Sequence, residues 1–132
     1  MQTLEIKIDW SDLDLLGHVN NVAIIRYFQS GRVTFCDSIG IPAVPGMHFG
    51  PIEAATEVKF CKQIHYPSTV TLQTAVIEVK NTSFILEHKI FDHNGEIAAV
   101  GKEVIVYFDF QKQTKILLTD ELKNKLFQAC EN

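Results

Sequence analysis

The feature that most limits how this chain can fold is a single long helical pattern followed almost entirely by strand patterns. Between residues 20 and 39, large apolar side chains and one glycine recur at intervals of four, three, four and four positions: Ile24, Phe28, Gly31, Phe35 and Ile39. That spacing places them on one face of a helix. Other apolar residues flank this face, so we expect the helix to be buried over much of its circumference: Val22, Ile25, Tyr27, Val33 and Cys36.

Strand patterns lie on both sides of this helix in the sequence. Residues 2–9 alternate between apolar and polar side chains, as in a half-buried strand. Four more strands are predicted after the helix, at residues 52–61, 69–79, 84–92 and 96–109. Asn94-Gly95 between the last two is a strong signal for a tight hairpin. A short amphipathic helix over 119–128, capped by Thr119 or Asp120, follows them.

This order of elements predicts an α+β fold in a single domain over residues 1–132. An antiparallel sheet of about five strands would wrap around one long central helix, with a short helix near the C-terminus. Val104, Ile105 and Val106 are consecutive in the last predicted strand, so we expect both of its faces to be covered. The central helix would cover one face and a second subunit the other.

Charge and composition exclude several functional classes. Sixteen acids against twelve bases give a net charge of −4, which argues against a general nucleic-acid binder. No apolar run approaches the roughly 18–20 residues of a membrane span, and the first ten residues lack the layout of a secretory signal. The three cysteines are widely spaced and odd in number. They are typical of free thiols, and we expect a cytoplasmic protein.

The stretch 12-DLDLLGHVNN-21 carries the strongest functional signal in the chain. A calcium loop is rejected, because Leu15 and Leu16 occupy ligand positions and no glutamate closes the set. The five histidines show no zinc-ligand spacing, so we expect no metal. A purely structural interpretation also exists, in which Asn20 or Asn21 caps the helix and Asp14 lies in a solvated turn.

The density of polar groups in this stretch favours chemistry over capping alone. Asp14 stands four residues before His18 and seven before Asn21, at the expected start of a buried helix. The first N–H groups of a helix lack intrahelical partners and carry partial positive charge. Such an end can stabilise an oxygen that becomes negative during acyl transfer, and a nearby carboxylate can direct water.

The segment 9-DWSDLDLLGHVNNVAIIRYFQSGRVTF-35 resembles the hot-dog-fold thioesterases, in particular the 4-hydroxybenzoyl-CoA thioesterase-like family and its acyl-carrier-protein thioesterase relatives. The order of strands and the stretch NGEIAAVGKEVIVYFD extend the resemblance over most of the chain. It implies a hot-dog fold and hydrolysis of acyl-CoA or acyl-carrier-protein thioesters. Coenzyme A would be part of the substrate, with no separate cofactor, and the protein would be a homodimer or homotetramer.

The same resemblance assigns roles within the motif. Asp14 matches the family's nucleophile or general base, and Asn21 lies where a helix-terminal N–H polarises the thioester carbonyl. His18 matches a histidine near the site, while Gly17 and Asn20 would contact the substrate. The sequence departs from the extended family pattern at four positions: Leu16, Ile24, Gln29 and Gly31. Three basic residues are candidate phosphate contacts for coenzyme A: Arg32, Lys59 and Lys62.

Two other functions are open at this level. A non-catalytic module that binds acyl thioesters is favoured by Leu16 and Gln29. A hot-dog hydratase or dehydratase is suggested by 43-AVPGMHFGPIEA-54, but the long helix precedes that stretch here. We therefore expect His48 and Glu53 to be loop residues. Cys61 and His65 are interpreted as packing and surface residues.

Overall fold

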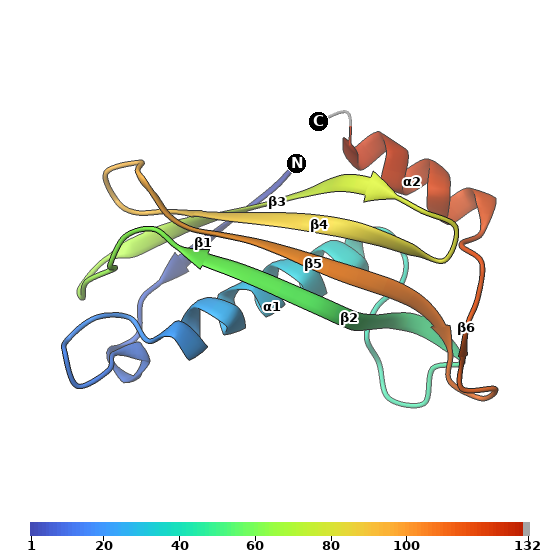
Figure 1. Cartoon of the computed structure of the whole chain (residues 1–132), viewed down its shortest axis with the longest axis horizontal. Helices are drawn as coiled ribbons and strands as arrows, with labels where there is room; N and C mark the ends of the chain where they lie inside the picture. The colour runs from blue at the N-terminus through green and yellow to red at the C-terminus, as the bar shows by residue number, and fades with distance from the viewer. Residues whose placement is uncertain (131–132) are drawn as a thin grey trace.

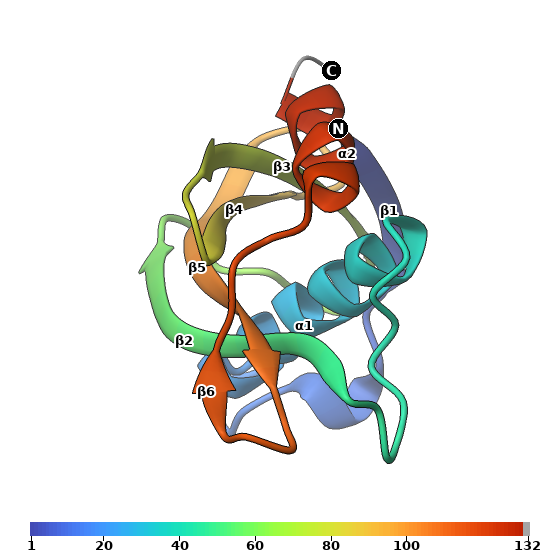
Figure 2. The same cartoon turned by 90° about the vertical axis from the view of Figure 1, so that its right-hand side faces the viewer.

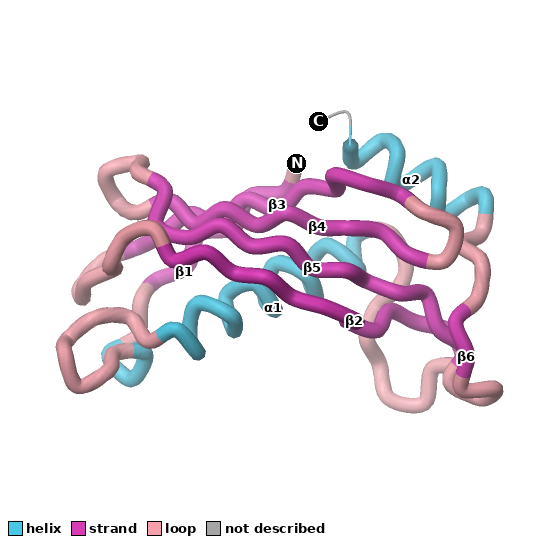
Figure 3. Tube along the Cα trace, in the orientation of Figure 1, coloured by secondary structure: helices cyan, strands magenta, loops and turns pink. Residues whose placement is uncertain are grey.

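The computed structural model describes residues 1–130 and confirms the predicted α+β architecture. Its elements, in chain order, are β1 (Gln2–Lys7), a 3₁₀ helix (Trp10–Asp12), α1 (Asn21–Ser38), β2 (Phe49–Phe60), β3 (Thr69–Val79), β4 (Ser83–Phe91), β5 (Ile97–Asp109), β6 (Thr114–Lys115) and α2 (Asp120–Cys130). All strand pairs are antiparallel, and the main sheet has the order β1-β3-β4-β5-β2 (Figures 1 and 3).

The curved sheet wraps around α1, as the end-on view in Figure 2 shows. Close contact between helix and sheet requires two glycines. A Cβ atom on Gly31 would lie 2.7 Å from Thr74 Oγ1, and one on Gly101 would collide with the Phe28 ring. The predicted helix face is therefore confirmed, because Ile24, Phe28, Gly31 and Phe35 all lie buried against the sheet.

The prediction that α1 is buried over much of its circumference is wrong for part of the flanks. Tyr27 and Cys36 are buried, whereas Val22, Ile25 and Val33 are 71%, 41% and 43% exposed. The sheet covers one side of the helix only, so apolar residues on the opposite side face outward. In the last long strand, Ile105 is fully buried toward α1 and its neighbours Val104 and Val106 are half-buried.

Several boundaries also differ from the predictions. β2 begins at Phe49, so Glu53 lies on a strand and not in a loop, while His48 precedes the strand as predicted. The 3₁₀ helix and β6 were not predicted, because three- and two-residue elements have no periodicity to detect. At the second helix, the Thr119 hydroxyl accepts the backbone N–H of Leu122 at 3.1 Å, which identifies Thr119 as the cap.

The hairpin at Asn94-Gly95 is confirmed between β4 and β5, where Gly95 has a φ of 78°. The Asp92 carboxylate accepts backbone N–H groups from Asn94 and Glu96 and so stabilises the turn. None of the helices within residues 1–130 has the length and apolar character needed to cross a membrane. Strand β2 forms one edge of the main sheet and pairs only with β5 among the described strands.

Candidate active site

The segment between β1 and α1 is organised around Asp12, whose side chain is buried. Asp9 and Asp12 form a reciprocal cap of the 3₁₀ helix: the Asp9 carboxylate accepts from Ser11 N, and the Asp12 carboxylate accepts from Asp9 N at 3.2 Å. The Tyr27 hydroxyl of α1 donates to Asp12 Oδ2 at 2.6 Å, and Arg26 pairs with Asp12 Oδ1. These contacts fasten the segment to the first turns of α1.

The pKa of Asp12 reflects this environment. Burial opposes its ionisation, but hydrogen bonds from Tyr27, Arg26 and the Asp9 backbone outweigh burial and lower the pKa below its ordinary value. Conversely, burial and the adjacent Asp12 carboxylate raise the pKa of Tyr27. The pair therefore consists of an ionised Asp12 and a neutral Tyr27 that donates its hydroxyl proton in the hydrogen bond. An ionised carboxylate is stable in this position because it accepts hydrogen bonds from three donors: Tyr27, Arg26 and the Asp9 backbone.

Asp14 lies in a tight turn that its own side chain helps to form. The carboxylate Oδ1 accepts the backbone N–H groups of Leu16 at 2.9 Å and His18 at 3.2 Å. The backbone N–H of Asp14 donates to the carbonyl of His18 at 2.8 Å, and Gly17 closes the turn with a φ of 81°. Within residues 1–130 both hydrogen bonds to this carboxylate use Oδ1, which leaves Oδ2 for water or a ligand.

The N-terminus of α1 begins directly after this turn. Asn20 is its cap: the side-chain oxygen accepts Val22 N at 3.0 Å, and the backbone N–H of Asn20 donates to the Asp12 carbonyl at 2.8 Å. In the described part of the chain, the backbone N–H of Asn21 has no protein acceptor. That N–H belongs to the positive end of an 18-residue helix and can donate a hydrogen bond to a ligand oxygen.

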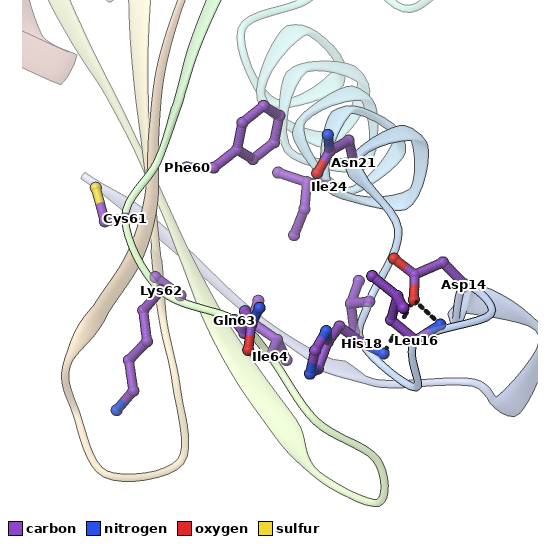
Figure 4. A pocket seen from close by; sticks show the side chains of 12 residues that line it. Asp14, Leu16, His18, Asn21, Ile24, Phe60, Cys61, Lys62, Gln63 and Ile64 are labelled. Atoms are coloured by element: carbon purple, nitrogen blue, oxygen red, sulfur yellow. Dashed lines mark hydrogen bonds between the residues drawn. The ribbon is translucent and has the colours of Figure 1, made fainter.

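A pocket of about 310 Å³ lies between this helix end and the segment that follows β2. Figure 4 shows Asp14 and Asn21 on one side and Phe60 on the other. The floor is apolar and buried, and consists of Val19, Ile24, Ile64 and Ala98. The rim carries the side chains of His18, Cys61, Lys62 and Gln63 and the exposed apolar side chain of Leu16. The pocket therefore combines an apolar floor with a carboxylate and a helix N–H.

His18 joins the two sides of the pocket. It forms an isolated antiparallel bridge with His65, and their rings meet edge to face with centroids 5.0 Å apart. The neighbouring N–H of Val19 donates to the carbonyl of Ile64 at 2.9 Å. These contacts hold the loop of Asp14 against the segment after β2. His65, interpreted from sequence as a surface residue, is exposed but also supports His18.

The structure brings most of the candidate site residues together. Asp14, His18 and Asn21 all line the pocket, and Gly17 and Asn20 lie in the same loop. Lys62 is at the rim, where its Nζ is 2.7 Å from Asp92 Oδ2 and 3.0 Å from Glu96 Oε2. These two acids and the hydrogen bonds they accept raise the pKa of Lys62.

Arg32 and Lys59 lie elsewhere. The Arg32 guanidinium is 2.9 Å from Glu53 Oε2 and 2.5 Å from Glu103 Oε2, so it neutralises acids between α1 and the sheet. Lys59 lies with Glu57, Val100 and Lys102 on a different hollow of the sheet. The structure therefore does not place either residue at the pocket of Asp14.

Several pocket residues were not recognisable from sequence. Phe60, Gln63, Ile64 and Ala98 come from segments far from the motif, and their residue types carry no signal of a site. Asp12 stands two residues before Asp14, but this spacing alone does not indicate a role. The sequence gives no sign that it is buried against Tyr27, 15 positions away.

Comparisons with known proteins bear on the family and the fold of the chain. A family model described as the thioesterase-like superfamily matches residues 8–126. No curated protein matches the chain. Among solved structures, a predicted thioesterase from Bacillus stearothermophilus is 26% identical, with a TM-score of 0.88 and coverage of 96% of this chain and 94% of the other.

Two solved structures from Staphylococcus aureus share the fold at lower identity. A DHNA-CoA thioesterase is 17% identical, with a TM-score of 0.84 and coverage of 98% of this chain and 89% of the other. The protein SAV2348, solved in complex with CoA, is 9% identical, with a TM-score of 0.91 and coverage of 98% and 84%.

Proposed function

The chain belongs to the thioesterase-like superfamily, and on that premise we propose that it hydrolyses an acyl thioester to the free acid and a thiol. One observation carries the proposal. Asp14 and Asn21 line the same pocket, whose floor is apolar, and the backbone N–H of Asn21 has no protein acceptor within residues 1–130. A thioester carbonyl placed between them meets a donor for its oxygen and a carboxylate near its carbon.

The chemistry follows from these two groups. The N–H at the start of α1 donates a hydrogen bond to the carbonyl oxygen and so stabilises the negative charge that develops there as the carbon becomes tetrahedral. Asp14 acts through Oδ2, and two routes are consistent with its position. It removes a proton from water that attacks the carbon, or it attacks the carbon itself and forms an anhydride that water then cleaves. In both routes the C–S bond breaks and the thiolate leaves.

We propose that the substrate is an acyl-coenzyme A and that no metal or redox cofactor takes part. The complex of SAV2348 with CoA supports this assignment by analogy of fold. Lys62 is the basic residue at the rim, where it would have to exchange its two carboxylate partners for a phosphate. The apolar floor of Val19, Ile24, Ile64 and Ala98 would receive the acyl group.

We further propose that a second copy of the chain completes the site. β2 is an edge strand with mostly exposed residues, and such edges pair readily with another strand. Leu16 and Phe60, on opposite sides of the pocket, are 78% and 48% exposed. These two apolar side chains would stay largely exposed to water even with a ligand in the pocket, unless another subunit covered them.

A thiol-release assay tests the proposed activity. Purified protein would be incubated with a panel of aliphatic and aromatic acyl-CoAs, and free coenzyme A would be detected with 5,5′-dithiobis(2-nitrobenzoic acid). We expect saturable release on at least one substrate. Binding of acyl-CoA without release across the whole panel would contradict the proposal and favour a non-catalytic binding module. Hydration of a 2-enoyl-CoA without hydrolysis would favour a hydratase.

A further inference from the structure

We propose that Asp12 is a positioning residue, which sets the relative placement of Asp14 and the N-terminus of α1 through its bond to Tyr27. This inference rests on the proposed function, because it concerns the same site. Asp12 does not line the pocket, and its side chain is only 3% exposed. It therefore acts through other residues and not on the substrate.

The argument begins with the two ends of the loop that carries Asp14. One end is Asp12 itself. The other is Asn20, whose backbone N–H donates to the Asp12 carbonyl at 2.8 Å. Between these ends, Leu13 and Val19 form an antiparallel bridge. Residues 13–19 therefore form a closed loop, and the backbone of Asp12 is half of its closure.

The side chain of Asp12 fastens this closed loop to α1. Tyr27 reaches back from the second turn of the helix, and its hydroxyl lies 2.6 Å from Asp12 Oδ2 in a buried contact. Arg26 pairs with the other carboxylate oxygen from a position that is 55% exposed. Because Tyr27 is 3% exposed and packed in the core, it is the more rigid of the two partners.

The geometry at the pocket depends on this attachment. Asn20 caps α1 through its side chain while its own N–H is held by Asp12, and the next N–H along the chain, that of Asn21, has no protein acceptor in the described residues. Asp14 lies two residues after Asp12, within the closed loop. A shift of Asp12 relative to α1 would change the separation of the two groups proposed to act on the thioester.

Burying a carboxylate costs desolvation free energy, and apolar packing of similar volume often stabilises a protein as well or better. A carboxylate can, however, accept hydrogen bonds from several directions at once. Asp12 accepts from Tyr27, from Arg26 and from the backbone of Asp9. It thereby joins the 3₁₀ helix, the loop and α1 at one point, which is a positional role.

Tyr27→Phe provides the sharpest test, because it removes only the hydroxyl and keeps the ring in the core. We expect kcat for acyl-CoA hydrolysis to fall about 10- to 100-fold with KM unchanged, since small displacements of reacting groups cost rate and not binding. We also expect the Asn20 amide to exchange with solvent faster by hydrogen-exchange NMR, while amides of β3 and β4 keep wild-type rates. Tyr107→Phe, at the opposite end of the sheet, is the matched control and should change none of these.

Asp12→Asn and Asp12→Ala form a second, graded test. Asparagine still accepts from Tyr27, so it should retain more kcat than alanine. Wild-type kcat in Tyr27→Phe, an unchanged Asn20 exchange rate, or faster exchange throughout the sheet would each overturn the inference. A wild-type chain that releases no thiol would reject the proposed function instead. In that case the exchange rate of Asn20 still decides whether Asp12 holds the loop.

Discussion

His88 Nε2 lies 2.6 Å from Glu103 Oε1, and both side chains are fully buried between α1 and the sheet. On its other side, His88 Nδ1 lies 2.8 Å from the Thr74 hydroxyl. The second oxygen of Glu103 meets Arg32, which also pairs with Glu53. Phe28 stacks on the His88 ring with centroids 4.9 Å apart. The core thus contains a connected polar network beneath the central helix.

The pKa values of the two acids in this network shift in opposite directions. Burial opposes ionisation of Glu103, but hydrogen bonds from His88 and Glu53 and the charge of Arg32 outweigh it and lower the pKa to about 2. Burial, together with the hydrogen bond to Glu103 and the repulsion from its charge, raises the pKa of Glu53 to about 7, although Arg32 acts against the rise. Glu53 is therefore the group whose protonation changes near neutral pH.

This difference predicts a pH-dependent stability. The pKa of Glu53 rises from 4.5 to about 7 on folding, so the folded state binds more protons than the unfolded state between these values. Stability linked to Glu53 is therefore full below about pH 4.5 and is lost as pH rises to about 7. We expect Glu53→Gln to melt at a higher temperature than wild type at pH 8 and at nearly the same temperature at pH 5. Differential scanning calorimetry at both values measures this.

Glu57→Gln is the control for that comparison, because Glu57 is on the same strand but lies opposite Lys102, away from Arg32 and Glu103. It should show no such pH-dependent gain. If Glu53→Gln were less stable than wild type at pH 8, the ion pair with Arg32 would outweigh the repulsion from Glu103. The predicted sign would then be wrong.

Asp14→Asn is expected to remove most thioester hydrolysis while leaving the fold intact. Asparagine can still accept the N–H groups of Leu16 and His18, so the turn should keep its shape. Loss of a catalytic base or nucleophile typically lowers the rate by about 10²- to 10⁴-fold. Steady-state kinetics with the best acyl-CoA would measure the change, with Asp9→Asn as the control. Near wild-type turnover in Asp14→Asn would exclude Asp14 as the acting group.

Gly101→Ala is expected to destabilise the protein by about 1–3 kcal/mol, because the new methyl group would collide with the Phe28 ring. Chemical denaturation would give the free energy of unfolding. In a Phe28→Leu background the same substitution should cost less, since the smaller side chain leaves space. Equal costs in both backgrounds would show that the sheet and not Phe28 limits this position.

Activity is expected to survive exhaustive treatment with EDTA. In residues 1–130 no group of three or more His, Cys, Asp or Glu side chains is arranged to bind a metal ion. The proposed chemistry uses a carboxylate and a backbone N–H alone. The rate of thiol release before and after chelation provides the measurement. Activity lost to EDTA and restored by a divalent ion would require a metal in the mechanism.

The protein is expected to be at least a homodimer. Sedimentation velocity at micromolar concentration should give a mass of at least twice the 14.9 kDa of one chain. Specific activity should fall when the protein is diluted below the dissociation constant of the dimer, because the exposed sides of the pocket would lose their cover. A monomer with undiminished specific activity would show that one chain forms the whole site.

Local patterns in the sequence were sufficient to predict α1, the strands β1 to β5 and the hairpin at Asn94-Gly95. The reason is that side-chain periodicity and turn chemistry depend on residues only a few positions apart. The cluster of Asp14, His18, Asn20 and Asn21 was predictable for the same reason. All four lie in one loop and helix start, so their proximity needs no knowledge of the fold.

Contacts across the fold were not predictable in this way. Arg32 meets Glu103 across 71 positions, so this candidate phosphate ligand is the partner of a buried acid. A period of two or 3.6 residues indicates which face is buried, but not which distant residue packs there. The same long-range packing brings Phe60 to the side of the pocket opposite Asn21, and Ile64 and Ala98 to its floor.

Strand β2 shows the limit most directly. Strict alternation would place Glu53 and Ala55 on the same face of the sheet. A β-bulge between them shifts the register, so that Glu53 pairs with the buried Ile105 and Ala55 with the half-buried Val104. The pattern of residues 52–61 is enough to predict a strand in this region. The face that Glu53 occupies depends instead on the extra residue of the bulge, which places Glu53 opposite Ile105 so that its partly exposed carboxylate meets Arg32.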